Sequence, residues 1–483
     1  MGTNGVHAQN FSGARIEHAL CQTGRMHGKG DQMFSSAVLD FTRSMEALRD
    51  LLSVVRGSLA DHLDGASKEG GKVFLRVSID AVRGAADLIT GERVAELQLL
   101  ADKAFGEGAV NVQEAIANTD YASTVLGVSD EALRVPFDRA AFMDMDEALD
   151  KMTSSIEKVH LLLGSSLLML ASITEWFVCR LIEQYYSKYP DAADSGEKAF
   201  TLSQLKQFDG VEDAEKYLAS QKVVDIMYGS VGDWVAWFKK ERKLDLGFFE
   251  SQMPAITEVF QRRHLLIHNG GVVNRLYLAN VAPELREGIA AGDSIPVDPA
   301  YINSSSQLLE VAFCGLACQF WKQLEPKSEA RTAVMLDVIY DRLVAGRDSC
   351  VEGLCQCVLN DKNAKESHLL TARVNYWLAL KRQGRIEEVR SEIEAADYSA
   401  KAGRFRLARL ALLDEVDRVL ADLPAAYRSD EVTIGEFVRW PLFADVREDQ
   451  RCEKLLKKLA KERQPSRKKP KAPPLVSPGN GPG

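Results

Sequence analysis

The sequence lacks a long uninterrupted hydrophobic run, a CxxC pair of cysteines and a recognisable signal peptide. Its longest apolar stretch, residues 159–171, is broken by a histidine, a glycine and two serines. This stretch is shorter than the roughly 18 to 20 residues that a membrane helix needs. The first 32 residues are polar and rich in glycine and contain no apolar segment of the kind that directs secretion. We therefore expect a cytoplasmic protein that does not associate with a membrane.

Cysteine and histidine are both scarce, with eight of each in the chain. The cysteines are scattered, which argues against a zinc ribbon and against a disulfide framework. Cys350, Cys355 and Cys357 lie close together in the sequence, and His368 is the histidine nearest to them. Buried thiols on a helix are the preferred interpretation, and a metal site is the alternative. We expect no bound metal and no cofactor.

The charge of the chain is unevenly distributed. The formal net charge is −9, but the segment from residue 451 to the end holds ten basic and two acidic residues, a net of +8, which leaves −17 for the rest. An acidic body does not attract nucleic acid non-specifically. RNA binding would therefore have to come from a local basic site or from the tail.

The sequence predicts a mainly α protein, because apolar residues recur at helical spacing from residue 33 onwards. The one candidate strand, residues 73–79, is equally compatible with a helix. Five regions are expected: a disordered leader (1–32), a helical N-terminal region (33–142) that opens with a helix at 33–63, a central helical bundle (143–325), a helical-hairpin domain (327–463) and a disordered basic tail (464–483).

Two long helices should frame the central region. The first, residues 165–189, carries a broad apolar surface and ends at a Tyr-Pro-Asp sequence, because proline disfavours helix in the residue before it. The second, residues 299–324, is expected to pack against the first. Residues 325–327 then mark a domain boundary.

The region after this boundary predicts paired helices. Residues 369–383 and 386–396 form one expected pair, and residues 402–413 and 416–423 form another. An Ala-Leu dipeptide recurs 32 residues apart, at 379–380 and 411–412, close to the period of about 34 residues of tetratricopeptide repeats. Residues 433–443 are expected to cap the last pair. A protein partner is expected at this domain.

Residues 260–271 contain two arginines, two histidines and an asparagine, in a short segment that otherwise has the pattern of a helix. The helix should begin near Pro254 and end at Gly270 and Gly271, which puts His268 in its last turn. Histidine can accept or return a proton near neutral pH, and arginine can donate two parallel hydrogen bonds to a phosphate. These two side chains suit the cleavage of an RNA phosphodiester by its own 2′-hydroxyl group.

The run Arg-His-Leu-Leu-Ile-His at residues 263–268 resembles the Arg-x4-His signature of the HEPN superfamily. The flanking residues 229–238 and 272–278 also resemble the surroundings of this motif in large bacterial HEPN proteins, and the resemblance covers about residues 145–325. It implies a helical bundle and a metal-independent RNase that leaves a 2′,3′-cyclic phosphate. It also implies a homodimer whose HEPN domains build a composite site across their interface.

The resemblance assigns catalytic roles to Arg263 and His268, with His264 in the polar position that follows the arginine. Asparagine or aspartate is frequent at that position in the family, so the resemblance assigns His264 no role that needs a side-chain amide. Three further residues are candidates for RNA binding or support, namely Arg262, Asn269 and Glu175. Arg262 also opens a second register, Arg-x5-His, and the sequence does not choose between the two.

Other interpretations of these residues stay open. Arg263 could pair with an acid inside the bundle while His268 caps its helix, or His264 and His268 could bind zinc from one helix face. The expected function is an endoribonuclease in bacterial defence or stress response, with RNA and a second copy of the chain as partners. The alternative is a non-catalytic interaction scaffold, or a sensor whose terminal domains gate the HEPN site.

Overall fold

The computed structural model describes residues 30–54, 95, 98, 139–193, 200–398 and 401–462. These residues form helices joined by turns and loops, and the one β-bridge among them pairs Val272 with Ser294. The prediction of a mainly α protein is confirmed. Residues 1–29 of the predicted leader, the candidate strand at 73–79, most of the N-terminal region and the basic tail lie outside the described residues. Residues 30–32 are described and already belong to the first helix, so the predicted boundary at residue 33 is three residues late.

The chain divides into two compact units between Glu325 and Pro326, where the sequence also indicates a boundary. Unit 1 contains a helix at residues 30–54, followed by α5 (Arg139–Lys188), η2 (Pro190–Ala193), α6 (Leu202–Leu205), α7 (Val211–Met227), α8 (Val231–Ala236), η3 (Trp237–Glu241), α9 (Gly247–Glu250), α10 (Met253–Asn269), α11 (Arg275–Asn280), η4 (Pro283–Leu285) and α12 (Pro299–Leu324).

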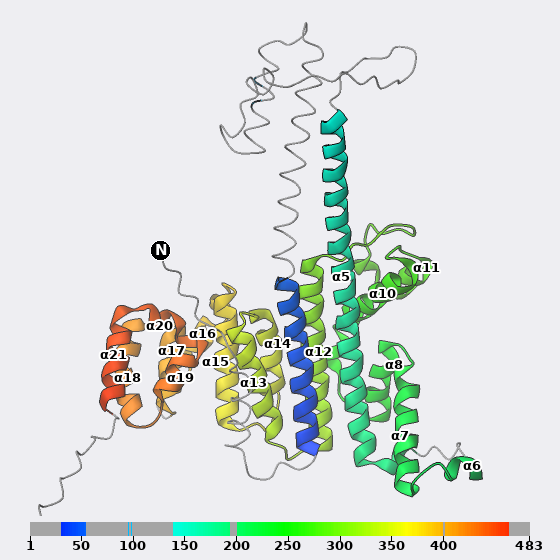
Figure 1. Ribbon diagram of the computed structural model, residues 1–483. Helices are drawn as coiled ribbons and strands as arrows, with labels where there is room; N and C mark the ends of the chain where they lie inside the picture. The colour runs from blue at the N-terminus through cyan, green and yellow to red at the C-terminus, as the bar shows by residue number, and fades with distance from the viewer. Residues whose placement is uncertain are drawn as a thin grey trace, which may run out of the picture. The chain divides into compact units, whose positions relative to one another are not determined.

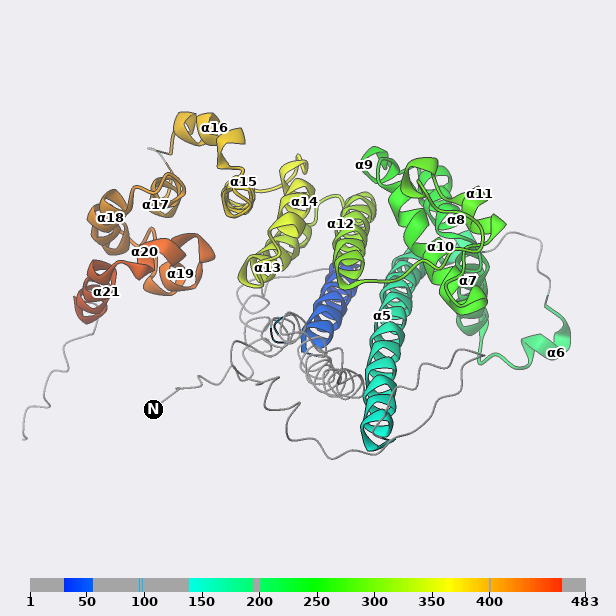
Figure 2. The ribbon, with the colours of Figure 1, turned by 90° about the horizontal axis from the view of Figure 1, so that it is seen from above.

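The core of unit 1 lies between α5, α12 and the helix at residues 30–54, which run side by side (Figures 1 and 2). Phe34 stacks on Trp321 of α12 at a centroid distance of 5.2 Å, and Phe41 stacks on Phe177 of α5 at 4.1 Å. Aromatic pairs of this kind bury large apolar areas. The first helix therefore shares one core with the central bundle, although the sequence analysis assigned it to a separate region.

Helix α5 begins well before residue 165, where the sequence analysis predicted its start. Two features explain why the glycine and serines near residue 165 do not interrupt it. Gly164 packs close to α10, since a Cβ atom there would lie 4.0 Å from the side chain of Leu266. The hydroxyl of Ser166 donates a hydrogen bond to the carbonyl of Leu162 at 2.7 Å, so its polar group is satisfied within the helix.

Part of α5 is long and apolar enough to cross a membrane by length and composition. In this part, Lys158–Lys188, the most apolar window has a mean hydropathy of 1.7, and 44% of that window is buried inside the protein. The core helix of a soluble protein meets the same criteria, so this evidence for a membrane span is weak. The side chains of Leu167, Leu170 and Phe177 are fully buried, and α5 is the central helix of unit 1.

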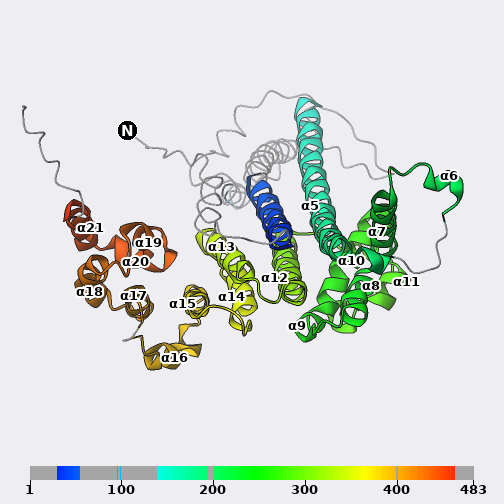
Figure 3. The same ribbon diagram turned by 90° about the horizontal axis from the view of Figure 1, so that it is seen from below.

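Unit 2 consists of short helices, seen in yellow-green to red in Figure 3. They are α13 (Ala330–Val344), α14 (Asp348–Leu359), α15 (Glu366–Arg382), η5 (Ile386–Glu388), α16 (Arg390–Ala395), α17 (Gly403–Leu412), α18 (Val416–Arg428), α19 (Ile434–Arg439), η6 (Pro441–Phe443), α20 (Ala444–Glu448) and α21 (Gln450–Glu462). Consecutive helices pack in pairs, α13 on α14, α14 on α15 and α17 on α18.

Two details of unit 2 concern the expected hairpins and their cap. Helix α18 continues past Pro424 to Arg428, whereas the sequence analysis ended it before the proline. Leu423 and Tyr427 are buried, and this packing outweighs the unfavourable proline. The expected capping segment forms α19 and η6, begins with a capping box at Thr433, and packs against α17 through η6.

Candidate active site on helix α10

Helix α10 presents the motif and ends as its sequence predicts. Its second residue is Pro254, and Gly270 follows its last residue in the left-handed conformation, with φ of 60°. Gly271 also has positive φ, and its N–H donates to the carbonyl of Leu265 at 3.1 Å. Glycine adopts this conformation without steric cost. The helix stop therefore lies directly after the motif, and His268 is in the last turn.

A buried carboxylate anchors α10 to the helices that follow it. Glu258 is only 5% exposed, and its Oε1 accepts hydrogen bonds from Arg262 Nε at 2.7 Å and from the Tyr277 hydroxyl at 2.9 Å. Its Oε2 accepts from the Tyr301 hydroxyl at 2.6 Å. Tyr277 belongs to α11 and Tyr301 to α12, so this one side chain joins three helices.

The Glu258 network also raises the pKa of its two tyrosines. Burial, followed by the nearby charge of Glu258, raises the pKa of Tyr277 to about 12 and raises the pKa of Tyr301 further. Both hydroxyls thus stay protonated and act as donors. Glu258, Tyr277 and Tyr301 were not among the residues predicted for this region. The available signal was the spacing of Glu258 and Arg262, which at i and i+4 favours an ion pair on one helix face.

Arg262 is directed into this network. Besides its bond to Glu258, its Nη1 donates to the carbonyl of Pro296 at 3.2 Å, and its guanidinium lies 4.0 Å from the centre of the Tyr301 ring. The side chain therefore holds α10 against the segment before α12. Its predicted contact with RNA stays a prediction.

Arg263 lies in a different environment and meets another predicted residue. Its Nη2 is 3.4 Å from Oε1 of Glu175 on α5, and the two side chains are 28% and 30% exposed. The Nε of Arg263 is buried and has no hydrogen-bond partner among the described residues. The structure thus brings Arg263 and Glu175 together while leaving donors of the guanidinium uncommitted.

The two histidines of the motif are neighbours on successive turns of α10. The centroids of the His264 and His268 rings are 4.4 Å apart and the ring planes are tilted by 45°. His264 is half-buried and His268 is exposed. Arg263 and His268 are five positions apart, about 140° around the helix axis. His264 is thus beside His268 in space and next to Arg263 in sequence.

The side chain of Asn269 forms a hydrogen bond at the end of helix α10. Its Nδ2 donates to the carbonyl of Val272 at 2.5 Å, across the turn formed by the two glycines. This bond orients the amide toward the turn. A role of Asn269 in RNA binding stays a prediction.

Metal-ligating residues do not gather in the described part of the chain, where no three His, Cys, Asp or Glu side chains are placed to share an ion. The zinc alternative at His264 and His268 thus has no third ligand within these residues. Cys350 and Cys355 are buried in α14, and burial raises the pKa of Cys355 well above its usual value. This favours the interpretation of Cys350 and Cys355 as buried thiols, whereas Cys357 is only partly buried.

A comparison of the chain with protein-family models, curated proteins and solved structures gives no match. The resemblance to HEPN proteins accordingly rests on the motif residues and their flanks. The family assignment stays a prediction.

Proposed function

We propose that this protein is a metal-independent endoribonuclease of the HEPN type. The observation that carries the proposal is the close pair of His264 and His268 near the end of α10, directly after the part-exposed Arg263 in the sequence. The 2′-hydroxyl of RNA would attack the adjacent phosphorus while a proton leaves the 2′-oxygen and another reaches the departing 5′-oxygen. The products are a 2′,3′-cyclic phosphate and a new 5′-hydroxyl end.

The side chains divide these tasks by their chemistry. His268 is exposed, and an imidazole can transfer a proton near neutral pH. Arg263 would stabilise the negative charge that grows on the phosphate oxygens, because a guanidinium has five N–H donors in a rigid plane. Its ion pair with Glu175 occupies one of its terminal nitrogens. His264, whose ring lies 4.4 Å from that of His268, would support the proton transfer.

A homodimer through unit 1 is part of the proposal. Leu161, Met169 and Trp176 are exposed on α5, at spacings of eight and seven residues that put them on one helix face. Ile267 is exposed on α10 beside the motif. Exposed apolar side chains that share one helix face are typical of association surfaces. Their position on the two helices that carry Glu175 and Arg263 supports a dimer that forms next to the site.

The test compares the wild type with His268→Ala and Arg263→Ala. We expect expression of the wild type to create new 2′,3′-cyclic phosphate ends in cellular RNA, and each substitution to lower their formation by about 10²- to 10³-fold. Matched controls are His368→Ala and Arg418→Ala in unit 2, which should leave cleavage unchanged. Thermal unfolding of each purified variant separates loss of activity from loss of fold.

A non-catalytic scaffold is the second candidate, favoured by the pairing of Arg263 with Glu175 inside unit 1. In that case the arginine orients two helices and has no part in chemistry. Purified wild-type protein would then leave mixed RNA intact in the presence of EDTA, and Arg263→Ala would lower stability without changing any RNA pattern. Size-exclusion chromatography with light scattering reports the dimer independently.

A further inference from the structure

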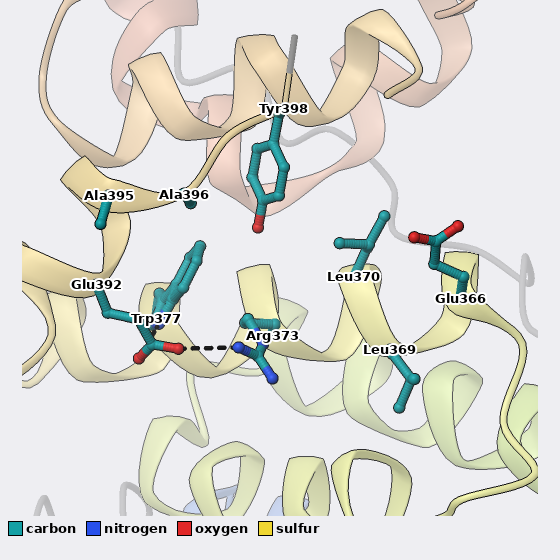
Figure 4. Close-up of a pocket in the computed structure, with 9 residues that line it drawn as sticks. All are labelled: Glu366, Leu369, Leu370, Arg373, Trp377, Glu392, Ala395, Ala396 and Tyr398. Atoms are coloured by element: carbon teal, nitrogen blue, oxygen red, sulfur yellow. Dashed lines mark hydrogen bonds and ion pairs between the residues drawn. The ribbon is translucent and has the colours of Figure 1, made fainter. Parts of the chain in front are cut away.

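Unit 2 contains a pocket of about 460 Å³ that is separate from the motif on α10. It lies between one face of α15 and the segment that follows α16 (Figure 4). Leu370, Arg373 and Trp377 of α15 line it, together with Glu392 of α16 and Tyr398. Small-molecule sites typically have volumes of about 300 to 1,000 Å³, apolar walls and a few polar groups that converge. This pocket has the size and the composition of such a site.

Tyr398 is the polar group that lacks a partner in this pocket. The residue is 7% exposed, and its buried hydroxyl has no hydrogen-bond partner among the described residues. In Figure 4 the hydroxyl points across the space between Leu370 and Trp377, toward Arg373. Burial raises the pKa of Tyr398, so the hydroxyl stays a donor at neutral pH. A buried hydroxyl without a hydrogen-bond partner destabilises a fold. An unpaired hydroxyl that faces a pocket therefore indicates a position where a ligand could accept a hydrogen bond.

The charges around the pocket cancel. Arg373 Nη1 lies 3.0 Å from Glu392 Oε1, and Glu392 Oε2 accepts a hydrogen bond from Trp377 Nε1 at 3.2 Å. At the N-terminal end of α15, Glu366 pairs with Lys401. Two carboxylates are thus matched by two cations, and a ligand with a net charge would gain little from them. The Arg373–Glu392 pair nevertheless offers N–H donors beside a carboxylate acceptor.

We propose that this pocket binds an uncharged small molecule in which a carboxamide-type group is attached to an apolar body. The carbonyl oxygen of the ligand accepts hydrogen bonds from the Tyr398 hydroxyl and the Arg373 guanidinium. The N–H of the ligand donates to the Glu392 carboxylate. The apolar body lies against Leu370, against Ala395 at the end of α16 and against Ala396, which follows it. This proposal does not depend on the RNase proposal, and the two are tested by separate experiments.

The experiment uses the full chain labelled with 5-fluorotryptophan and followed by ¹⁹F NMR. Trp377→Phe identifies the Trp377 resonance by its disappearance. Three probes with one apolar body are titrated: 4-phenylbutanamide, 4-phenylbutanoate and 4-phenylbutylamine. We expect a saturable shift of the Trp377 resonance with the amide, and affinities at least about fivefold weaker for the two charged probes, since they leave pocket donors or acceptors unpaired.

Tyr398→Phe separates ligand binding from structure. It removes an unpaired hydroxyl, so the midpoint of thermal unfolding should stay the same or rise, while affinity for the amide falls by about fivefold. Tyr340→Phe is the matched control, because the Tyr340 hydroxyl donates to the carbonyl of Arg439 at 3.1 Å outside the pocket. It should leave affinity unchanged. The proposal is overturned if no probe gives a saturable shift, if a charged probe binds best, or if Tyr398→Phe binds the amide like the wild type.

Discussion

The Nη2 of Arg263 on α10 lies 3.4 Å from Oε1 of Glu175 on α5, which joins the motif helix to the central helix of unit 1. The neighbouring Arg262 pairs instead with the buried Glu258. Two consecutive arginines thus meet different carboxylates. Of the two, Arg263 is the more accessible, with 28% of its side chain exposed against 13% for Arg262.

Replacing Glu175 with glutamine tests the role of that ion pair. Both side chains are part-exposed, so we expect the free energy of unfolding to change by less than about 1 kcal/mol. Loss of the carboxylate removes a negative charge beside the proposed phosphate site, so RNA should bind severalfold more tightly at low salt. Fluorescence anisotropy with labelled RNA measures this. Glu183→Gln, an exposed carboxylate on the same helix, is the control, and an equal gain in that variant would show that the effect is not local.

Replacing Glu258 with alanine should be far more damaging. It leaves Arg262, Tyr277 and Tyr301 without their shared acceptor, and breaking a buried ion pair typically costs about 3 to 5 kcal/mol. Urea unfolding measures the loss. Glu250→Gln removes a pair with Lys239 whose side chains are half-exposed, and we expect less than about 1 kcal/mol there. Similar values for the two variants would show that the Glu258 network contributes little.

The Glu258 network also predicts a dependence of stability on alkaline pH. The pKa of Tyr277 is raised from 10.0 to about 12 in the folded protein by burial and by Glu258. The folded state therefore keeps a proton that the unfolded state loses, so stability is full below about pH 10 and falls as the pH rises through about 12. Urea unfolding at about pH 9 and about pH 11 should show a smaller loss for Tyr277→Phe than for the wild type. Tyr228→Phe, at an exposed position, should behave like the wild type; a reduced loss there instead would assign the effect to general alkaline unfolding.

The packing of the first helix on α5 gives a prediction for stability. Phe41 is fully buried and stacks on Phe177, so Phe41→Ala should lower the free energy of unfolding by about 3 to 5 kcal/mol. Leu51 lies on the same helix but is 53% exposed, and Leu51→Ala should cost less than about 0.5 kcal/mol. Calorimetry on both variants measures the difference. A small effect of Phe41→Ala would mean that residues 30–54 do not belong to the core of unit 1.

Helix ends were the most predictable part of this fold. The bounds of α12, Pro299 to Leu324, agree with the prediction at both ends, and α10 stops at the glycines that follow its motif. These ends depend on local chemistry, because proline, glycine and short polar caps act within one turn. Helix interiors were less predictable. Gly164 and Pro424 read as interruptions in the sequence, yet both helices continue because buried neighbours stabilise them.

The sequence by itself determined the helical character of the described chain, the glycine stop after α10 and the set of polar residues that α10 carries. Only the tertiary structure decided which carboxylate each arginine meets. Glu258 is buried because Tyr277 and Tyr301 come from two other helices, and Glu175 reaches Arg263 because α5 packs against α10. Periodicity describes one helix at a time. The environment of Arg262 and Arg263 depends on contacts between helices that are distant in the chain.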